Sequence, residues 1–505
     1  MNPLASVALP IPPGLIAVLD FVQWSAIAWF FALHLASLAP AYVATVRAVL
    51  RQHRHGVRLP WGNVGPCQPP VSILVPAFND EPGIVATVRA LLRLGYRDYE
   101  IIVVNDGSSD DTLQALVRAF GLVPFPEAYR RRLRTGQLHC LFASPAYPRV
   151  RVVDKAHGGR ADALNAGINC ARFPLFCVVD TQRVLQRDSL DRMVQPFLED
   201  ATTVAAFGAL RVVNGCQARD GFVTRADLPR RLLPMLQAVE SLRGFVQARL
   251  AGPALNALPA MPGAFGLFHK ERIIAAGGYR DDTAAVDMEL CLRLHGQLRA
   301  QRRPYRIAFV PDPVCWVRAP ETLRRLRRQR SQAQRGLVES LLTHARMLFR
   351  REDGAVGSWS LPILLLVECA GPVIEVLGYA AVLLLALAGQ LSPQSAAVFL
   401  FASVGLGIVH SLHAVATEEL SFQLHPGPGQ RVALVAAAIV ENLGYRQLTS
   451  AWRVMGLSQA LAALRARARV QPVAVSRPRP RQNPRRPAPA PAIPRPKVTR
   501  GVEHA

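Results

Sequence analysis

The eight cysteines of this 505-residue chain include no C-x-x-C pair and have no histidine nearby at the spacing of metal ligands. They are too sparse for a disulfide framework and lack the signature of a zinc site, so we expect buried thiols in a reducing compartment. Acidic residues are also scarce, since 35 Asp and Glu stand against 59 Lys and Arg and leave a net charge of +24. Half of the residues are nevertheless hydrophobic, which excludes a disordered chain.

The positive charge is concentrated in four Arg-rich segments, residues 47–58, 127–151, 318–351 and 465–505. The last of these alternates Arg with Pro and Ala, and we expect residues 461–505 to form a disordered tail, either as a solvated tether or in contact with anionic lipid headgroups. No aromatic residues are interleaved with the arginines of this tail, so nucleic acid is not expected as a partner. The segment 127–151 has no function that the sequence assigns.

Long uncharged runs predict membrane-spanning helices. Residues 21–46 contain no formal charge, which predicts a membrane-spanning helix. No cation precedes them, so they lack the charged start of a signal peptide. Residues 376–417 are also uncharged and are broken by a turn at 389–394, which predicts a hairpin of two helices. The run 432–440 is too short to span, so residues 431–456 are expected to form an interfacial or protein-buried helix. Three spans with the basic segments inside predict a multi-pass inner-membrane protein whose soluble domain and tail are cytoplasmic.

The chain therefore divides into four expected parts: residues 1–60, 68–351, 352–460 and 461–505. The second part alternates strands at 71–76, 100–104 and 175–179 with helices at 83–94 and 112–120, which predicts an α/β domain with a mostly parallel sheet. Ligands in such sheets bind at the carboxyl ends of the strands, where Asn79, Asp106 and Asp180 stand. Lys155 precedes a Gly-Gly-Arg helix start that suits a diphosphate.

In this order, these elements resemble the GT-A (Rossmann-like) catalytic domain of family 2 glycosyltransferases, the membrane-associated inverting group that includes cellulose, hyaluronan and poly-N-acetylglucosamine synthases. Residues 263–268 and Gly277-Gly278-Tyr279 also match it, and residues 441–448 resemble a membrane segment of bacterial members. The resemblance implies transfer of a sugar from a nucleotide donor, UDP-linked, to a lipid or glycan acceptor in envelope or exopolysaccharide synthesis, with polysaccharide-synthesis subunits as partners.

The resemblance also implies roles for individual residues. Asp106 contacts the base, and Asp180, the first acid of a D-x-D motif, binds the diphosphate through Mg²⁺ or Mn²⁺. Asp287 acts as the catalytic base. Asn79 and Lys155 are expected as further substrate contacts, as is Gln329, the first residue of a Q-x-x-R-W motif on the acceptor side.

The sequence departs from the family at several of these positions. Gln182 replaces the second acid of D-x-D, which is expected to lower metal affinity, and Val286 replaces the acid before the base. Gln332 and Ala333 replace the Arg and Trp of the acceptor motif, which argues against long-chain processive synthesis. The alternative is a catalytically impaired relative that acts as a nucleotide-sugar-binding or scaffold subunit. His295, on an apolar helical face, is expected to be packed and not catalytic.

Overall fold

A computed structural model describes residues 12–55, 68–219, 221–251, 256, 265–422 and 427–470. The chain divides into a large unit that ends at Ala460 and a short unit from Leu461 onward. The last helix runs to Val470, so the start of the expected disordered tail is helical because the apolar pattern continues past residue 461. The remainder of that tail, 471–505, and residues 56–60 lie outside the described residues.

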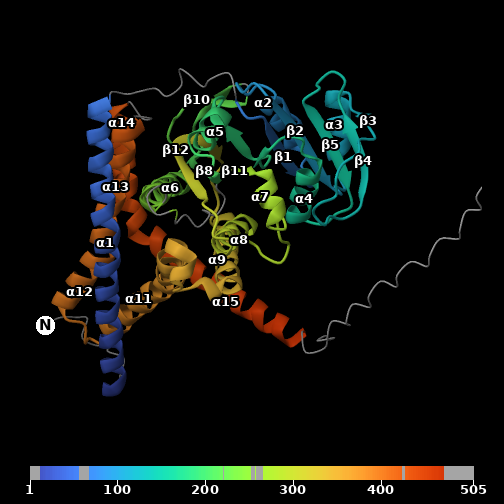
Figure 1. Cartoon of the computed structure of the whole chain (residues 1–505). Coiled ribbons are helices and arrows are strands. Elements are labelled where there is room, and N and C mark those ends of the chain that lie inside the picture. The colour runs from blue at the N-terminus through green and yellow to red at the C-terminus, as the bar shows by residue number, and fades with distance from the viewer. Residues whose placement is uncertain are drawn as a thin grey trace, which may run out of the picture. The chain divides into compact units, whose positions relative to one another are not determined.

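The α/β domain is built on a mixed sheet, which has ten strands among the described residues, in the order β3-β4-β5-β2-β1-β6-β11-β8-β12-β7 (Figure 1). β5, β2, β1 and β6 are parallel neighbours, and β11 runs antiparallel between β6 and β8. The strands are β1 Val71–Ala77, β2 Tyr99–Asp106, β3 Val123–Pro124, β4 Leu138–Ala143, β5 Val150–Lys155, β6 Leu175–Val178, β7 Arg183–Leu185, β8 Thr203–Val212, β11 Phe265–His269 and β12 Arg306–Val317; β9 Gln217–Arg219 and β10 Phe222–Arg225 form a separate hairpin.

Helices cover both faces of the sheet, and this is why the central strands are buried along their whole length. Ile73 on β1 faces a cluster with Ile84 and Leu116, whereas the next residue, Leu74, faces a cluster with Leu164. The helices of this domain are α2 Glu81–Leu91, α3 Thr112–Phe120, α4 Arg160–Cys170, α5 Ser189–Glu199, α6 Leu232–Ala251, α7 Lys270–Ala275, α8 Val286–Ala300 and α9 Leu323–Thr343. The expectation of an α/β domain with buried parallel strands is confirmed.

Among the described residues, three helices are long and apolar enough to cross a membrane: Pro13–Leu38, Val356–Leu387 and Pro393–Leu420. They match the three expected spans. The helical region consists of α1 Pro13–His55, 3₁₀ turns at Ala345–Met347 and Arg351–Asp353, α10 Leu361–Ile363, α11 Gly371–Leu387, α12 Pro393–Leu400, α13 Leu406–Phe422, α14 Pro428–Val440 and α15 Arg446–Val470, with π-helical turns at Val356–Ser360, Leu364–Ala370, Phe401–Gly405 and Glu441–Tyr445.

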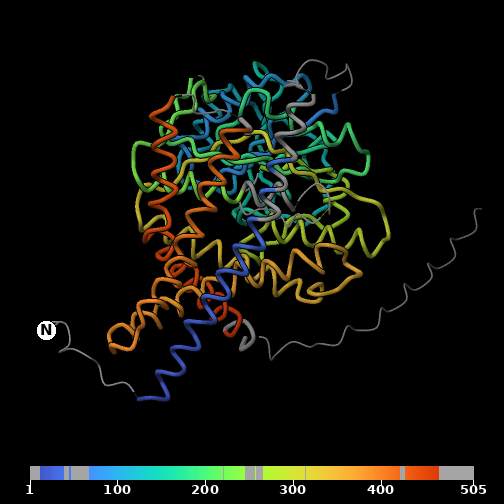
Figure 2. The backbone as a smooth tube through the Cα atoms, turned by 90° about the vertical axis from the view of Figure 1, so that its left-hand side faces the viewer, coloured from blue at the N-terminus to red at the C-terminus, as the bar shows by residue number. Residues whose placement is uncertain are grey.

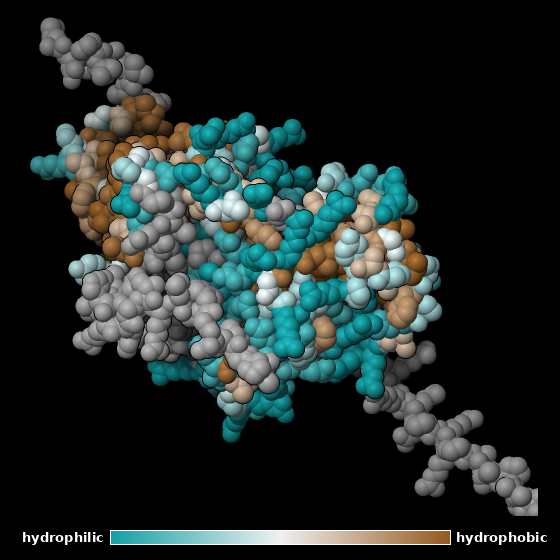
Figure 3. All heavy atoms as spheres, turned by 90° about the horizontal axis from the view of Figure 1, so that it is seen from above, coloured by the Kyte–Doolittle hydropathy of each residue, from teal (hydrophilic) through white to brown (hydrophobic). Residues whose placement is uncertain are grey.

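The apolar helices pack on one another and expose large side chains on their outer faces. α1 lies along α11 and α13 (Figures 1 and 2). Phe21 and Leu35 of α1 are 74% and 73% exposed. In the view of Figure 3, hydrophobic residues gather on the side of the apolar helices, while the rest of the face is mostly hydrophilic with a smaller hydrophobic area. An apolar surface of this kind fits a lipid environment.

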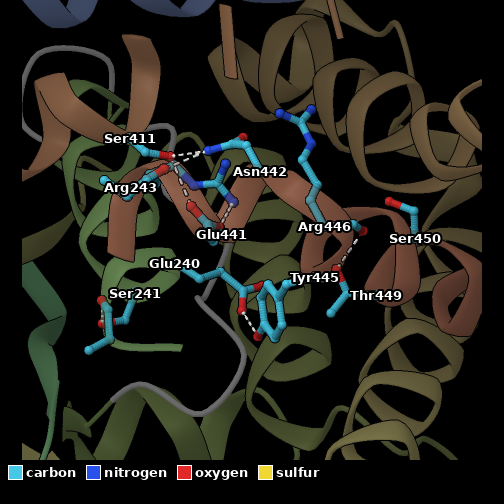
Figure 4. A network of polar contacts seen from close by, with 12 residues as sticks. Glu240, Ser241, Arg243, Ser411, Glu441, Asn442, Tyr445, Arg446, Thr449 and Ser450 are labelled. Atoms are coloured by element: carbon cyan, nitrogen blue, oxygen red, sulfur yellow. Dashed lines mark hydrogen bonds and ion pairs between the residues drawn. The ribbon is translucent and has the colours of Figure 1, made fainter. Parts of the chain in front are cut away.

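Buried charges join the helical region to the α/β domain. Arg211 of β8 donates two hydrogen bonds to Glu418 of α13, at 2.8 and 2.9 Å. Glu441, between α14 and α15, pairs with Arg243 of α6 at 2.7 Å and accepts a hydrogen bond from Ser411 (Figure 4).

The residues 441–448 that resemble a family segment lie at this junction, and they differ from the single helix expected over 431–456. The Tyr445 hydroxyl donates to Glu240 of α6 at 2.7 Å, while Glu441 and Asn442 are fully buried. The chain kinks at Leu443 and Gly444, where Gly444 takes a φ of 101° that other residues rarely adopt. The kink brings Glu441 and Tyr445 to α6, which accords with the protein-buried alternative.

Candidate active site

The loops that follow β1 and β2 are hydrogen-bonded to each other at one edge of the sheet. Asn79, with a φ of 50°, donates its backbone N–H to the Ser108 hydroxyl at 3.0 Å, and its side-chain oxygen accepts from the Ser109 N–H at 2.8 Å. The Asp80 N–H donates to Thr112 at 2.9 Å. The turns after β1 and β2, which carry Asp80 and Asp110, therefore lie side by side, and Asn79 links them.

Asp106 is almost fully buried and accepts hydrogen bonds from the loop after β5. Lys155 lies 2.5 Å from its Oδ1, and the backbone N–H groups of Gly158 and Gly159 donate to its two carboxylate oxygens at 3.0 and 2.8 Å. Through these contacts Asp106 fixes the conformation of residues 155–159.

Lys155 differs from the substrate contact that we expected. Its side chain is 0% exposed and its ammonium group also pairs with Asp162 at 2.5 Å. A buried ammonium group needs such partners, because desolvation without them is costly. Lys155 therefore positions the Gly158-Gly159 loop from behind and does not face the site.

An aromatic platform beside Asp106 was missed by the sequence reasoning. Phe78 is 49% exposed, and its ring lies 4.5 Å from that of His157, with 32° between their planes. An exposed large aromatic side chain at the carboxyl end of a strand is the signal that points to it, because aromatic faces stack on nucleobases.

Asp180, at the end of β6, lies between two arginines. Arg160, the first residue of α4, pairs with one carboxylate oxygen, and Arg183 pairs with the other at 2.8 Å. Burial alone would raise the pKa of Asp180, but the charges of Arg183 and Arg160 outweigh it and hold the pKa below its usual range. Asp180 is therefore ionised at neutral pH.

Asp287, in the first turn of α8, lies close enough to Asp180, Arg160 and Arg183 to feel their charges. Asp287 is half-buried, and its side chain makes no hydrogen bond or ion pair with any residue that the structure describes. Burial raises the pKa of Asp287 above the usual value, an effect that the two arginines oppose. The structure thus brings Asp180 and Asp287 together, with an unengaged carboxylate at the position expected for a base.

Three further side chains position Asp287 and its surroundings, and sequence reasoning missed all three. Asn165 accepts from the Tyr279 N–H and donates to the Tyr279 carbonyl, both at 2.8 Å. Arg293 of α8 donates to the Gly278 carbonyl at 2.6 Å. Glu339 of α9 accepts from the Ala284 N–H at 3.0 Å, just before α8 begins.

The Tyr279 hydroxyl is buried without a hydrogen-bond partner among the described residues. Burial, and then the charge of Asp287, raise the pKa of Tyr279 well above the usual value, so the hydroxyl keeps its proton. A buried donor of this kind usually has a ligand or a water as its partner.

Gln329 is exposed on α9, and its side chain is not hydrogen-bonded to any described residue. Gly336, two turns further along the same helix, packs closely on Ala285. Gln329 therefore lies roughly 10 Å along the helix axis from the start of α8. Gln332 and Ala333 are exposed as well, so α9 presents neither a cation nor an aromatic ring at the two positions where the acceptor motif has Arg and Trp.

The residues around Asp180 are a poor fit for the expected divalent metal. Gln182 is exposed and makes no hydrogen bond in the described ranges, and both oxygens of Asp180 hold arginines. No group of three or more His, Cys, Asp or Glu side chains suited to a metal occurs among the described residues. A divalent cation at a nucleotide site is typically held by one or two carboxylates together with substrate phosphates, but here Asp180 is already paired with two arginines and Gln182 brings no charge.

Two other sequence features have structural roles. Within the basic segment 127–151, Arg151 is buried and pairs with Glu100 at 3.0 Å and with Glu127. His295 is fully buried against the Tyr305 hydroxyl at 2.8 Å, which confirms that it is packed. All seven cysteines that the structure describes are free thiols.

A mixed sheet with helices on both faces, and acidic residues gathered at its strand ends, defines an α/β domain of the GT-A type. Residues 72–236 match the family model described as Glycosyl transferase family 2, so the chain carries a glycosyltransferase domain of family 2. This match confirms, for residues 72–236, the family 2 glycosyltransferase domain that the sequence motifs indicated.

Relatives and solved structures of similar kind were found. The chain is 27% identical over 276 residues to poly-beta-1,6-N-acetyl-D-glucosamine synthase of Staphylococcus aureus, a match that covers 54% of this chain and 55% of that protein. It is 27% identical over 274 residues to the probable glycosyltransferase YdaM of Bacillus subtilis, with 53% and 55% covered. The chain thus spans about half the length of the curated relatives it matches.

Among solved structures, the mannosyltransferase PcManGT from Pyrobaculum calidifontis, in complex with GDP-Man and Mn²⁺, is similar to this chain with a TM-score of 0.47 and 20% identity, over 82% of this chain and 99% of that one. S. aureus TarS 1–349 in complex with UDP-GlcNAc gives a TM-score of 0.34 and 13% identity, over 75% and 92%.

Proposed function

We propose that the protein transfers a sugar from a nucleotide donor to a lipid or glycan acceptor by an inverting displacement. The observation that carries this proposal is the unengaged carboxylate of Asp287 beside Asp180, Arg160 and Arg183 at the ligand-binding edge of the sheet. Asp287 takes the proton of an acceptor hydroxyl as its oxygen attacks the anomeric carbon. The bond from that carbon to the diphosphate breaks, and its electron pair leaves with the nucleoside diphosphate.

The other residues of the site have supporting roles in this proposal. Phe78 stacks on the base, next to the loop that Asp106 and Lys155 brace. The Tyr279 hydroxyl, held in place by Asn165, donates a hydrogen bond to the bound substrate. UDP is the nucleotide that the family resemblance implies.

We further propose that the acceptor is reached at the cytoplasmic surface of the inner membrane, in envelope or exopolysaccharide synthesis. Three apolar helices beside the α/β domain support this placement, as does the similarity to a polysaccharide synthase. The absence of the acceptor-side aromatic at Ala333 favours short additions over a long processive chain.

The test is a panel of radiolabelled nucleotide sugars offered to the purified full-length protein in lipid nanodiscs, with wild type and Asp287→Asn in parallel. We expect transfer or donor hydrolysis with one nucleotide sugar, lowered at least about 100-fold by the substitution. Turnover that survives Asp287→Asn overturns the assignment of the base. Binding of nucleotides without turnover across the panel supports a non-catalytic binding subunit instead.

A further inference from the structure

Asp180 has two cationic partners in a place where family resemblance implies a metal ion. Arg160 and Arg183 each engage one of its carboxylate oxygens, the second at 2.8 Å. The Arg183 side chain is only 10% exposed, so water screens this pair weakly. A divalent ion bound to Asp180 would lie beside these two guanidinium groups, whose positive charges repel it.

The cluster has no net charge and presents two guanidinium groups. The carboxylates of Asp180 and Asp287 are balanced by the guanidinium groups of Arg160 and Arg183, whereas a second acid in place of Gln182 would make the cluster negative. A negatively charged cluster needs a divalent cation before it accepts a diphosphate. A cluster with no net charge and two guanidinium groups does not need a divalent cation to bind a diphosphate, because each guanidinium has five N–H donors that match phosphate oxygens.

The turn that carries Arg183 is held rigidly. The Arg183 N–H donates to the Asp180 carbonyl at 3.0 Å, and the Thr181 carbonyl accepts from the Thr87 hydroxyl of α2 at 2.9 Å. The Thr181 hydroxyl donates to Asp80 in the loop after β1. Donors fixed in this way do not need to reorganise when charge develops on a leaving group.

We propose that Arg160 and Arg183 bind the diphosphate of the donor directly and stabilise it as the leaving group, in the place of a divalent cation. Asp180 then acts as a positioning residue that orients the two guanidinium groups. This inference deepens the proposed function and rests on it. It makes donor binding independent of Mg²⁺ and Mn²⁺.

The test measures binding of UDP, GDP, ADP and CDP to the full-length protein in detergent by isothermal titration calorimetry, in EDTA and again with excess Mn²⁺. We expect one nucleotide to bind with the same Kd, within about twofold, in both conditions. Arg183→Gln should weaken it at least tenfold in both, which corresponds to the loss of one charged hydrogen bond. Arg187→Gln, an exposed arginine four residues further on, is the matched control and should bind as wild type does.

A double variant, Gln182→Asp with Arg183→Thr, keeps the proposal testable if Arg183→Gln folds poorly. We expect its binding to be weak in EDTA and to recover with Mn²⁺. If wild type binds a nucleotide only with Mn²⁺, or if either variant binds normally in EDTA, this inference is overturned and the proposed function stands. If no nucleotide binds in either condition, both are overturned.

Discussion

The buried pair between Arg211 and Glu418 gives a sharp prediction about how the α/β domain is attached to the helical region. The two side chains are 5% and 1% exposed and share two hydrogen bonds, although they come from β8 and α13. Removal of one partner leaves a charge buried without its counter-ion, which typically costs about 3–5 kcal/mol. Replacement of both by apolar side chains of similar volume removes that penalty.

We therefore expect Arg211→Met and Glu418→Met each to destabilise the protein by about 3–5 kcal/mol, and the double variant to regain most of that stability. For a domain of this size the single variants should lower the midpoint of thermal unfolding by about 6 °C or more. The assay is thermal unfolding of the full-length protein in one detergent, followed by intrinsic fluorescence. Arg231→Met is the control, since its exposed pair with Glu321 should contribute no more than about 1 kcal/mol. Strictly additive effects in the double variant would refute the reasoning.

Further predictions concern the site. Asp287→Asn should leave the protein folded and no less stable at pH 7. The pKa of Asp287 is raised on folding, so its ionisation destabilises the folded protein as pH rises, and Asn carries no such charge. The kcat/KM of the wild type should fall as pH drops through that raised pKa, which a pH–rate profile would show. Gly278→Ala should lower both stability and turnover, since Gly278 has a φ of 72° and a Cβ would lie 2.4 Å from Asn165. Gly389→Ala is the control for backbone strain alone, because Gly389 has a φ of 68° and open space around a Cβ. Equal losses of stability in thermal melts of the two variants would contradict the clash with Asn165. Phe78→Ala should weaken UDP binding roughly tenfold by calorimetry, and unchanged affinity would remove the stacking role.

The strands and the apolar helices were predictable because their signals are local. The β-branched run at the start of the domain predicts β1 to within one residue, and the uncharged runs mark the three long helices. Asp287 and Asp180 were also predicted to share a site, on the basis of motif order and the family resemblance. Their proximity to each other is what the structure adds.

The partners of charged side chains were not predictable, since they depend on contacts between distant segments. The sequence predicts Lys155 as a substrate contact, yet its ammonium group is buried and paired with Asp106 and Asp162. The segment 127–151 is rich in arginine in the sequence, yet its Arg151 is buried and forms an ion pair with Glu100. Asn165 carries no sequence signal for its contact with Tyr279, because the two are 114 residues apart.

The long sequence separation of the junction contacts has a consequence for synthesis. Arg211 and Glu418 are 207 residues apart, and Glu240 and Tyr445 are 205 apart. At usual elongation rates the ribosome needs roughly 10 to 40 seconds to cover that distance, so the α/β domain waits with unpaired charges on β8 and α6 until α13 to α15 emerge. A fragment that ends at residue 351 never receives those partners. The C-terminal helices therefore complete the folding of the domain that precedes them.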